Sequence, residues 1–195
     1  MIEALEKEKV YSVDEYFALD EQSKEKLEYR NGKIKVMSGG TAKHSEIAAR
    51  IIAILVNTLD QSDIKYRVYT SDTKIQIPSY STFVYPDAVV VSLEPEFYQD
   101  RKDIITNPLL VVEVLSPSTQ NYDRDGKFLA YRTIPSFQEY LLIDQDRPQV
   151  TTFYRNEARH WEDNDIMGLD KTVTLRSVDC EIPLSRIYKN IDFGA

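Results

Sequence analysis

The sequence has little cysteine and no long apolar run. Cys180 is the single cysteine among 195 residues, so an internal disulfide is impossible and a zinc site built from several cysteines is excluded. No window of about 18 residues is apolar enough to predict a transmembrane helix. Residues 1–7 lack the basic-then-apolar order of a signal peptide. We therefore expect a cytoplasmic protein with no membrane-spanning segment.

Common catalytic motifs and an excess of positive charge are absent as well. The sequence has no Gly-x-Ser-x-Gly nucleophile elbow, no Gly-rich phosphate loop and no His-Glu-x-x-His zinc motif. Its formal net charge is -8. Because proteins that bind polyanions usually carry basic surfaces, this charge counts against strong nonspecific binding to nucleic acid. Acidic residues gathered at a metal site, with cations facing the phosphates, would reconcile an acidic chain with such a substrate.

Composition and hydrophobic periodicity predict the fold class. With 195 residues, 42% of them hydrophobic, the chain fits a single domain spanning residues 1–195, in which residues 1–10 are expected to fray. Helices are expected after the Ser12–Glu15 capping box, from Thr41 to Asp60 and from Asp123 to Tyr131. Leu93 to Asn107 is polar and is expected to form a loop. Strands are predicted at 27–30, 33–36, 66–69, 73–77, 88–91, 109–115, 141–143, 150–154 and 172–175. This order predicts an α/β (α+β) protein built around a mixed sheet.

Two polar residues in the first quarter of the chain have local explanations. Asn31-Gly32 supplies the two positive-φ positions of a type I′ turn, which places Glu28 opposite Lys35 in a hairpin. Glu28 would then form a cross-strand ion pair on the solvent face. His44 begins an apolar stripe on the following helix, so it is either a hydrogen-bonded histidine at the rim of the core or part of a site. The stripe continues through Ala48, Ile51, Leu55 and Leu59.

Glu113 lies inside the apolar run Leu109–Ser116, which predicts a strand covered on both faces. An ionised carboxylate buried without a partner costs several kcal/mol, so such a group is paired with a cation, bound to a metal or neutralised by a raised pKa. Two explanations therefore remain open for Glu113. One is an ion pair with a Lys or Arg at the sheet edge, and the other is a metal site.

Asp87 and Lys127 could complete a metal site around Glu113. Asp87 begins a strand directly after Pro86, and Lys127 lies one turn into the helix that follows Glu113. If the two strands are neighbours, the two carboxylates can share Mg²⁺ or Mn²⁺, which needs neither His nor Cys. Such an ion lowers the pKa of a bound water and neutralises charge on a phosphodiester, and the lysine can orient or help deprotonate that water. The alternatives are a turn role for Asp87 and a surface ion pair between Lys127 and Asp123.

Several segments occur in an order typical of a known nuclease family. They are Tyr85–Val91, Asn107–Thr119, Asp123–Phe128, Tyr131-Arg132 and Ile134–Ser136. Pro86-Asp87 followed by Glu113 in an apolar strand is similar to the PD-(D/E)xK nuclease superfamily. The whole series resembles the Uma-two family of bacterial restriction endonucleases, and the likeness extends from the Glu28 hairpin to Phe153-Tyr154.

This resemblance implies a restriction-endonuclease-like fold, with a central mixed sheet flanked by helices, and metal-dependent hydrolysis of DNA. The superfamily pattern has a lysine two residues after the acid, where this chain has Leu115. In the family the lysine is displaced to the following helix, which maps its role onto Lys127. Glu28 and His44 correspond to the family's N-terminal acid and helix histidine. The implied metal ligands are Asp87 and Glu113.

Three functional hypotheses follow. The leading hypothesis is a Mg²⁺- or Mn²⁺-dependent DNA endonuclease in which Glu28 and His44 assist positioning or proton transfer. The second is a catalytically silent, nuclease-like module that binds a protein or nucleic-acid partner, favoured by the acidity of the chain and by Leu115. The third is a nuclease acting on RNA or on a mobile-element intermediate. A homodimer would supply two symmetry-related sites for cutting two strands.

Overall fold

A computed structural model describes residues 9–37, 39–116 and 126–194. Within these ranges the elements are α1 (Val13–Gln22), β1 (Leu27–Arg30), β2 (Lys33–Val36), α2 (Ala42–Leu59), β3 (Tyr66–Thr70), β4 (Lys74–Ile77), a 3-10 turn (Pro78–Tyr80), β5 (Thr82–Val84), β6 (Ala88–Ser92), β7 (Phe97–Tyr98), β8 (Arg101–Ile105), β9 (Leu110–Leu115), α3 (Phe128–Tyr131), β10 (Glu139–Asp144), β11 (Gln149–Arg155), β12 (Trp161–Met167), β13 (Thr172–Leu175), β14 (Cys180–Pro183) and α4 (Leu184–Ile187). None of the described helices has both the length and the apolar character needed to cross a membrane.

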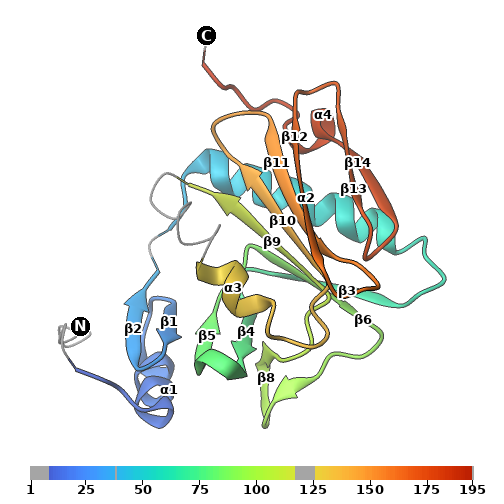
Figure 1. The fold of residues 1–195 in the computed structure, drawn as a ribbon. Helices are drawn as coiled ribbons and strands as arrows, with labels where there is room; N and C mark the ends of the chain where they lie inside the picture. The colour runs from blue at the N-terminus through green and yellow to red at the C-terminus, as the bar shows by residue number, and fades with distance from the viewer. Residues whose placement is uncertain (1–8, 38, 117–125, 195) are drawn as a thin grey trace.

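Two large mixed sheets organise the protein (Figure 1). The first has the strand order β12-β11-β10-β9-β6-β3, in which β9 and β10 are parallel and the other neighbours are antiparallel. The second has the order β2-β1-β5-β4-β8-β7. Together with the flanking helices, this arrangement confirms the predicted α+β class with mixed sheets.

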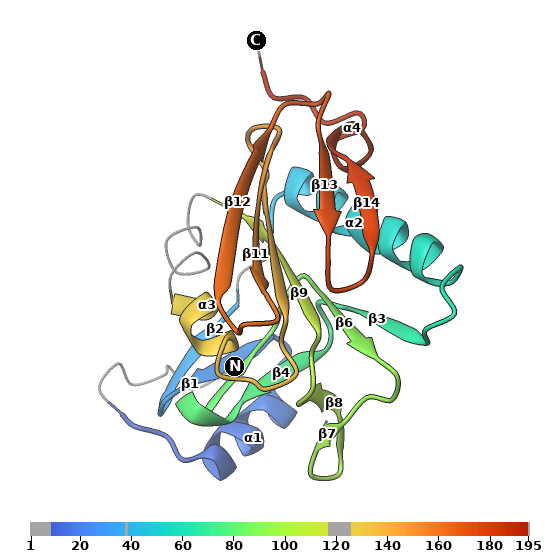
Figure 2. The ribbon, with the colours of Figure 1, turned by 45° about the vertical axis from the view of Figure 1, so that its right-hand side comes forward.

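The first sheet is covered on both faces, which explains its apolar strands. On one face α2, the β13–β14 hairpin and α4 pack against alternate residues of β6, β9 and β10 (Figure 2). On the other face α3 and the second sheet pack against the intervening residues. All six residues of β9 are buried, and Glu113 is the charged residue among them. Odd-numbered residues of β9 therefore face α3, and even-numbered residues face α2.

Local signals in the sequence account for the elements nearest the site. The Ser12–Glu15 capping box begins α1, and Thr41 caps α2 by accepting a hydrogen bond from the backbone N–H of His44. The β1–β2 hairpin turns at Asn31 and Gly32, whose φ angles are 46° and 88°. Its register pairs Glu28 with Lys35, as predicted. Most of the predicted stripe on α2 packs in the core on the face of β9 that carries even-numbered residues.

Several predicted boundaries were wrong. The segment Leu93–Asn107, predicted as a loop, contains β7 and β8, which pair at the edge of the second sheet. Hydrophobic periodicity did not predict β12, because the residues of this strand are mostly exposed and polar. Only the end of the predicted helix Asp123–Tyr131 can be compared, since residues 117–125 lie outside the described part of the chain; there α3 spans Phe128–Tyr131.

Glu139 at the start of β10 fixes the β13–β14 hairpin against the sheet. It is fully buried, and its carboxylate accepts hydrogen bonds from the backbone N–H groups of Arg176 and Ser177 and from the Ser177 hydroxyl, at 3.1, 2.9 and 2.7 Å. Burial raises the pKa of Glu139 above its ordinary value, although these hydrogen bonds act in the opposite direction. The folded protein therefore holds the Glu139 proton more tightly than the unfolded chain does.

Replacing Glu139 with Gln is expected to lower the free energy of unfolding by roughly 1–3 kcal/mol, because one acceptor for a buried backbone N–H is lost. Since the folded pKa is raised, the stabilisation contributed by Glu139 is complete below its ordinary pKa of 4.5 and declines as the pH rises through the folded value. Gln does not titrate, so the stability gap between the two proteins should narrow from acid to neutral pH. Urea unfolding across this range measures the gap, and a gap that widens with pH would contradict the assignment.

Candidate functional site

The candidate site lies where the chain crosses from one sheet to the other. β5 belongs to the second sheet and β6 to the first, and the connecting residues are Tyr85, Pro86 and Asp87. β6 and β9 are antiparallel, with Ala88 paired with Val112, so Asp87 lies one step further along, across from Glu113. Glu113 lies on the face covered by α3, where it contacts Lys127 and Tyr131. The Asp87 carboxylate lies at the end of this strand pair, where it contacts the backbone of Val114 and His44 of α2.

Lys127 and Tyr131 both donate hydrogen bonds to Glu113. Lys127 Nζ lies 2.8 Å from Glu113 Oε1, and the Tyr131 hydroxyl lies 3.2 Å from the same oxygen. All three side chains are buried. The buried carboxylate thus has the cationic partner that its position required, and the displaced lysine reaches it from the start of α3. Glu113 could form this ion pair and bind a metal at the same time, because its carboxylate has two oxygens.

Asp87 contacts both the neighbouring strand and α2. Its Oδ2 accepts a hydrogen bond from the backbone N–H of Val114 at 2.7 Å, next to Glu113 in the chain. The same oxygen lies 3.4 Å from His44 Nε2. The side chains of Asp87 and His44 are 15% and 19% exposed, so this part of the site is accessible from solvent whereas Glu113 is not.

Glu28 is fully buried, which rules out the predicted ion pair with Lys35 on the solvent face. Its carboxylate instead pairs with Arg30 and accepts a hydrogen bond from the backbone N–H of Tyr85 at 3.0 Å. The error arose because both faces of β1 are covered, so a polar residue on the face away from the aromatic core is still enclosed. Glu28 therefore holds in place the backbone that leads into Asp87, and its effect on the site is indirect.

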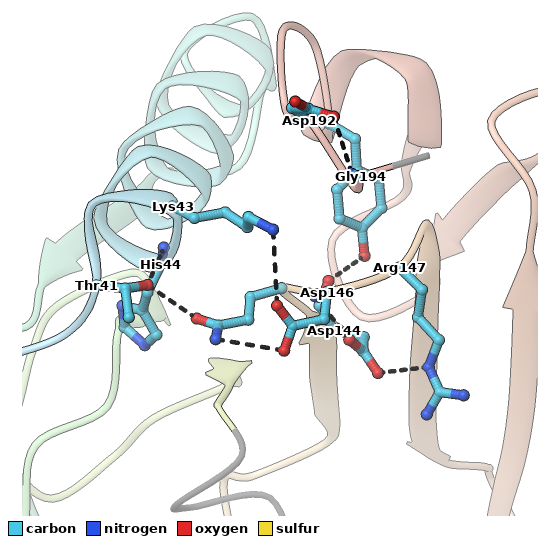
Figure 3. Close-up of polar contacts among 10 residues, drawn as sticks. Thr41, Lys43, His44, Asp144, Asp146, Arg147, Asp192 and Gly194 are labelled. Carbon is cyan, nitrogen blue, oxygen red and sulfur yellow. Dashed lines mark hydrogen bonds and ion pairs between the residues drawn. The ribbon is translucent and has the colours of Figure 1, made fainter.

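A polar network supports the start of α2. The Thr41 hydroxyl accepts from the His44 backbone N–H at 3.1 Å and donates to Gln145 Oε1 at 3.2 Å. Figure 3 shows Thr41 and Lys43 reaching towards the acidic turn that follows β10. There Lys43 Nζ lies 3.7 Å from Asp146. Gln145 is buried, so this contact ties the first turn of α2 to the strand beside β9.

Tyr85 lies between two lysines beside this crossover. Lys26 Nζ and Lys74 Nζ are each 5.2 Å from the centre of its ring, a distance at which a cation is attracted to an aromatic face. Burial, reinforced by nearby carboxylates including Asp20, raises the pKa of the Tyr85 hydroxyl far above its ordinary value. Tyr85 therefore stays neutral at physiological pH and acts here through packing.

Tyr131 and Gln145 were not predicted as site residues. Tyr131 follows Lys127 by four residues, a spacing that aligns two side chains on one helix face. That spacing is the sequence signal that could have placed Tyr131 beside Lys127 at the site. Gln145 had no comparable signal, since its contact with Thr41 joins residues 104 positions apart.

The donor set fits a hard divalent cation. Among the described residues no three His, Cys, Asp or Glu side chains gather closely enough to hold a metal by themselves. Mg²⁺, however, usually retains several waters and is held by one or two carboxylates together with substrate phosphates. Asp87 and Glu113 supply carboxylates where β6 and β9 pair, so these two residues would hold such a cation without soft ligands.

Comparisons with known proteins agree with the fold and extend over most of the chain. The model of the family Uma2, described as "Putative restriction endonuclease", matches residues 13–185. The uncharacterized protein slr1290 of Synechocystis sp. (strain ATCC 27184 / PCC 6803 / Kazusa) is 37% identical over 184 residues, covering 93% of each chain. The uncharacterized protein sll1609 of the same strain is 36% identical over 160 residues, covering 82% of this chain and 89% of the relative.

A solved structure shares the fold. The crystal structure of a "putative nuclease belonging to DUF820" from Anabaena variabilis ATCC 29413 aligns with a TM-score of 0.73 over 90% of this chain and 96% of that chain, at 19% sequence identity. This similarity supports a nuclease-like fold. Since the family model covers residues 13–185 and two relatives share more than a third of their aligned residues with it, the chain belongs to the Uma2 family.

Proposed function

We propose that this protein is a Mg²⁺- or Mn²⁺-dependent DNA endonuclease that hydrolyses phosphodiester bonds. The observation that carries the proposal is the buried Glu113 carboxylate, which accepts a hydrogen bond from Lys127 and adjoins Val114, whose backbone N–H donates to the Asp87 carboxylate. Membership of the Uma2 family supports a nucleic-acid substrate. Cutting both strands of a duplex would use two copies of the chain related by a two-fold axis.

Asp87 and Glu113 would hold the cation. Bound there, it supplies Lewis-acid stabilisation of the phosphodiester and lowers the pKa of a water molecule. Lys127 fixes the orientation of the Glu113 carboxylate and would supply an ammonium group next to the bound cation. Its charge would offset negative charge that develops in the transition state.

His44 and Glu28 would act around the two metal ligands. His44 lies against Asp87 and is partly exposed, so it can orient that carboxylate or transfer a proton at its Nε2. Glu28 is a positioning residue, because it holds the backbone of Tyr85 two residues before Asp87. The alternative of a catalytically silent module rested partly on the lysine missing from position 115. The contact between Lys127 and Glu113 supports the displaced lysine as its replacement, and the assays below distinguish the two functions.

A plasmid assay tests the proposal. Purified protein with Mn²⁺ is expected to nick or linearise supercoiled plasmid DNA, and EDTA should stop the reaction because hydrolysis depends on the cation. Calorimetric titration should show Mn²⁺ binding to the wild-type protein. A folded protein that neither binds Mn²⁺ nor cuts DNA would refute the nuclease assignment in favour of a binding module.

A further inference from the structure

The β1–β2 hairpin has one apolar face and one charged face. Its register pairs Glu28 with Lys35 and Arg30 with Lys33, and cross-strand partners project from the same side. The opposite face, which carries Tyr29 and Ile34, packs in the aromatic cluster with α1. One face of this hairpin therefore carries three cations and a single carboxylate.

The two lysines on this face are available to a ligand. Lys33 and Lys35 are exposed, and neither forms an ion pair within the described part of the chain. The single carboxylate, Glu28, is buried and already paired with Arg30. The exposed charge of the hairpin face is thus positive.

The charged face is linked to the candidate site through Glu28. Glu28, on the same face as Lys33 and Lys35, binds the backbone of Tyr85 two residues before Asp87. Lys33 and Lys35 are two residues apart on a strand, which separates their Cα atoms by about 6.6 Å. Two flexible side chains at that spacing can each contact a different phosphate of one strand.

We propose that the charged face of the β1–β2 hairpin, through Lys33 and Lys35, binds the phosphate backbone of DNA beside the bond that is cut. This inference rests on the proposed nuclease function and adds the surface that holds the substrate. It also gives an acidic protein a positively charged contact for a polyanion, because Lys33 and Lys35 are both exposed on one strand. Such contacts supply affinity and position without reading base sequence.

The salt dependence of binding tests this proposal. Binding of a fluorescein-labelled DNA duplex is measured by anisotropy in EDTA, so that no cleavage occurs, over a series of salt concentrations. Each phosphate contact contributes about 0.9 to the slope of log K against log salt, so the Lys33→Gln/Lys35→Gln variant should lose about two units of slope. Both side chains are exposed, so its melting temperature should equal that of the wild type.

The matched control is Arg186→Gln/Lys189→Gln. These two cations are also exposed and lie in and after α4, on the opposite side of the first sheet, so the net charge changes equally while the hairpin is untouched. The control should keep the wild-type slope. Equal slope changes in both variants, or none in the hairpin variant, would overturn the hairpin assignment while leaving the nuclease proposal intact. If the wild-type protein binds no duplex at all, both proposals fail.

Discussion

Glu113→Gln and Asp87→Asn should each abolish Mn²⁺-dependent cleavage of plasmid DNA. A cation at this site is asked to supply several kcal/mol of transition-state stabilisation, and at about 1.4 kcal/mol per tenfold in rate its loss predicts a decrease of at least about a thousandfold. In Glu113→Gln the amide oxygen can still accept from Lys127 and Tyr131, so the geometry is kept while the negative charge is removed. Rates are measured from the conversion of supercoiled to nicked plasmid.

Asp87→Asn tests whether a loss of cleavage in Glu113→Gln comes from the site and not from misfolding. Asp87 is partly exposed, and the amide oxygen of Asn can still accept from the Val114 N–H, so stability should change little. Asp163→Asn is the control, because Asp163 is an exposed carboxylate on β12, at the far edge of the first sheet. Calorimetry should show weakened Mn²⁺ binding for both site variants and wild-type Mn²⁺ binding for Asp163→Asn. Wild-type cleavage rates in both site variants would show that catalysis occurs elsewhere.

Lys127→Met should destabilise the protein by about 3–5 kcal/mol, because it leaves a buried carboxylate without its countercharge. Lys127 and Glu113 are both about 5% exposed or less, so water cannot compensate for the loss. Replacing both residues, as in Glu113→Leu/Lys127→Met, should recover most of that stability, since no charge then remains buried. Urea unfolding provides the free energies.

Lys65→Met supplies the contrast. Lys65 pairs with Glu94 through side chains that are 56% and 68% exposed, and exposed pairs contribute about 0–1 kcal/mol, so Lys65→Met should change the free energy of unfolding by no more than that.

Mn²⁺ should restore part of the stability of Lys127→Met. It should not stabilise Glu113→Leu/Lys127→Met, because the cation needs the Glu113 carboxylate. A change below about 1 kcal/mol in Lys127→Met would mean that the Glu113 charge is already compensated by other groups.

Strong local signals predicted much of the fold. The Asn31-Gly32 turn, the Thr41 cap and the apolar run through Glu113 each specify an element from neighbouring residues alone. β7, β8 and β12 were missed because many of their residues are partly or fully exposed, so these strands show no regular hydrophobic alternation. Glu28 was misplaced for a related reason, since burial on the second face of β1 depends on segments distant in the chain.

The site was predicted only as far as its residue types and order allowed. The sequence indicated that Glu113 needed a partner, but the choice of Lys127 as that partner depends on how α3 packs on the sheet. The proximity of Asp87 to the strand that carries Glu113 follows from the antiparallel pairing of β6 and β9, which no local pattern reveals. The catalytic roles of all five residues remain predictions for the experiments above.

The crossover from β5 to β6 determines when the proposed site can form during synthesis of the chain. Asp87 sits on the three-residue bridge between the two sheets, Glu28 fastens that bridge from the first hairpin, and Lys127 arrives from a segment made later. The residues proposed for the site can therefore come together only after the segment that carries Lys127 has been synthesised.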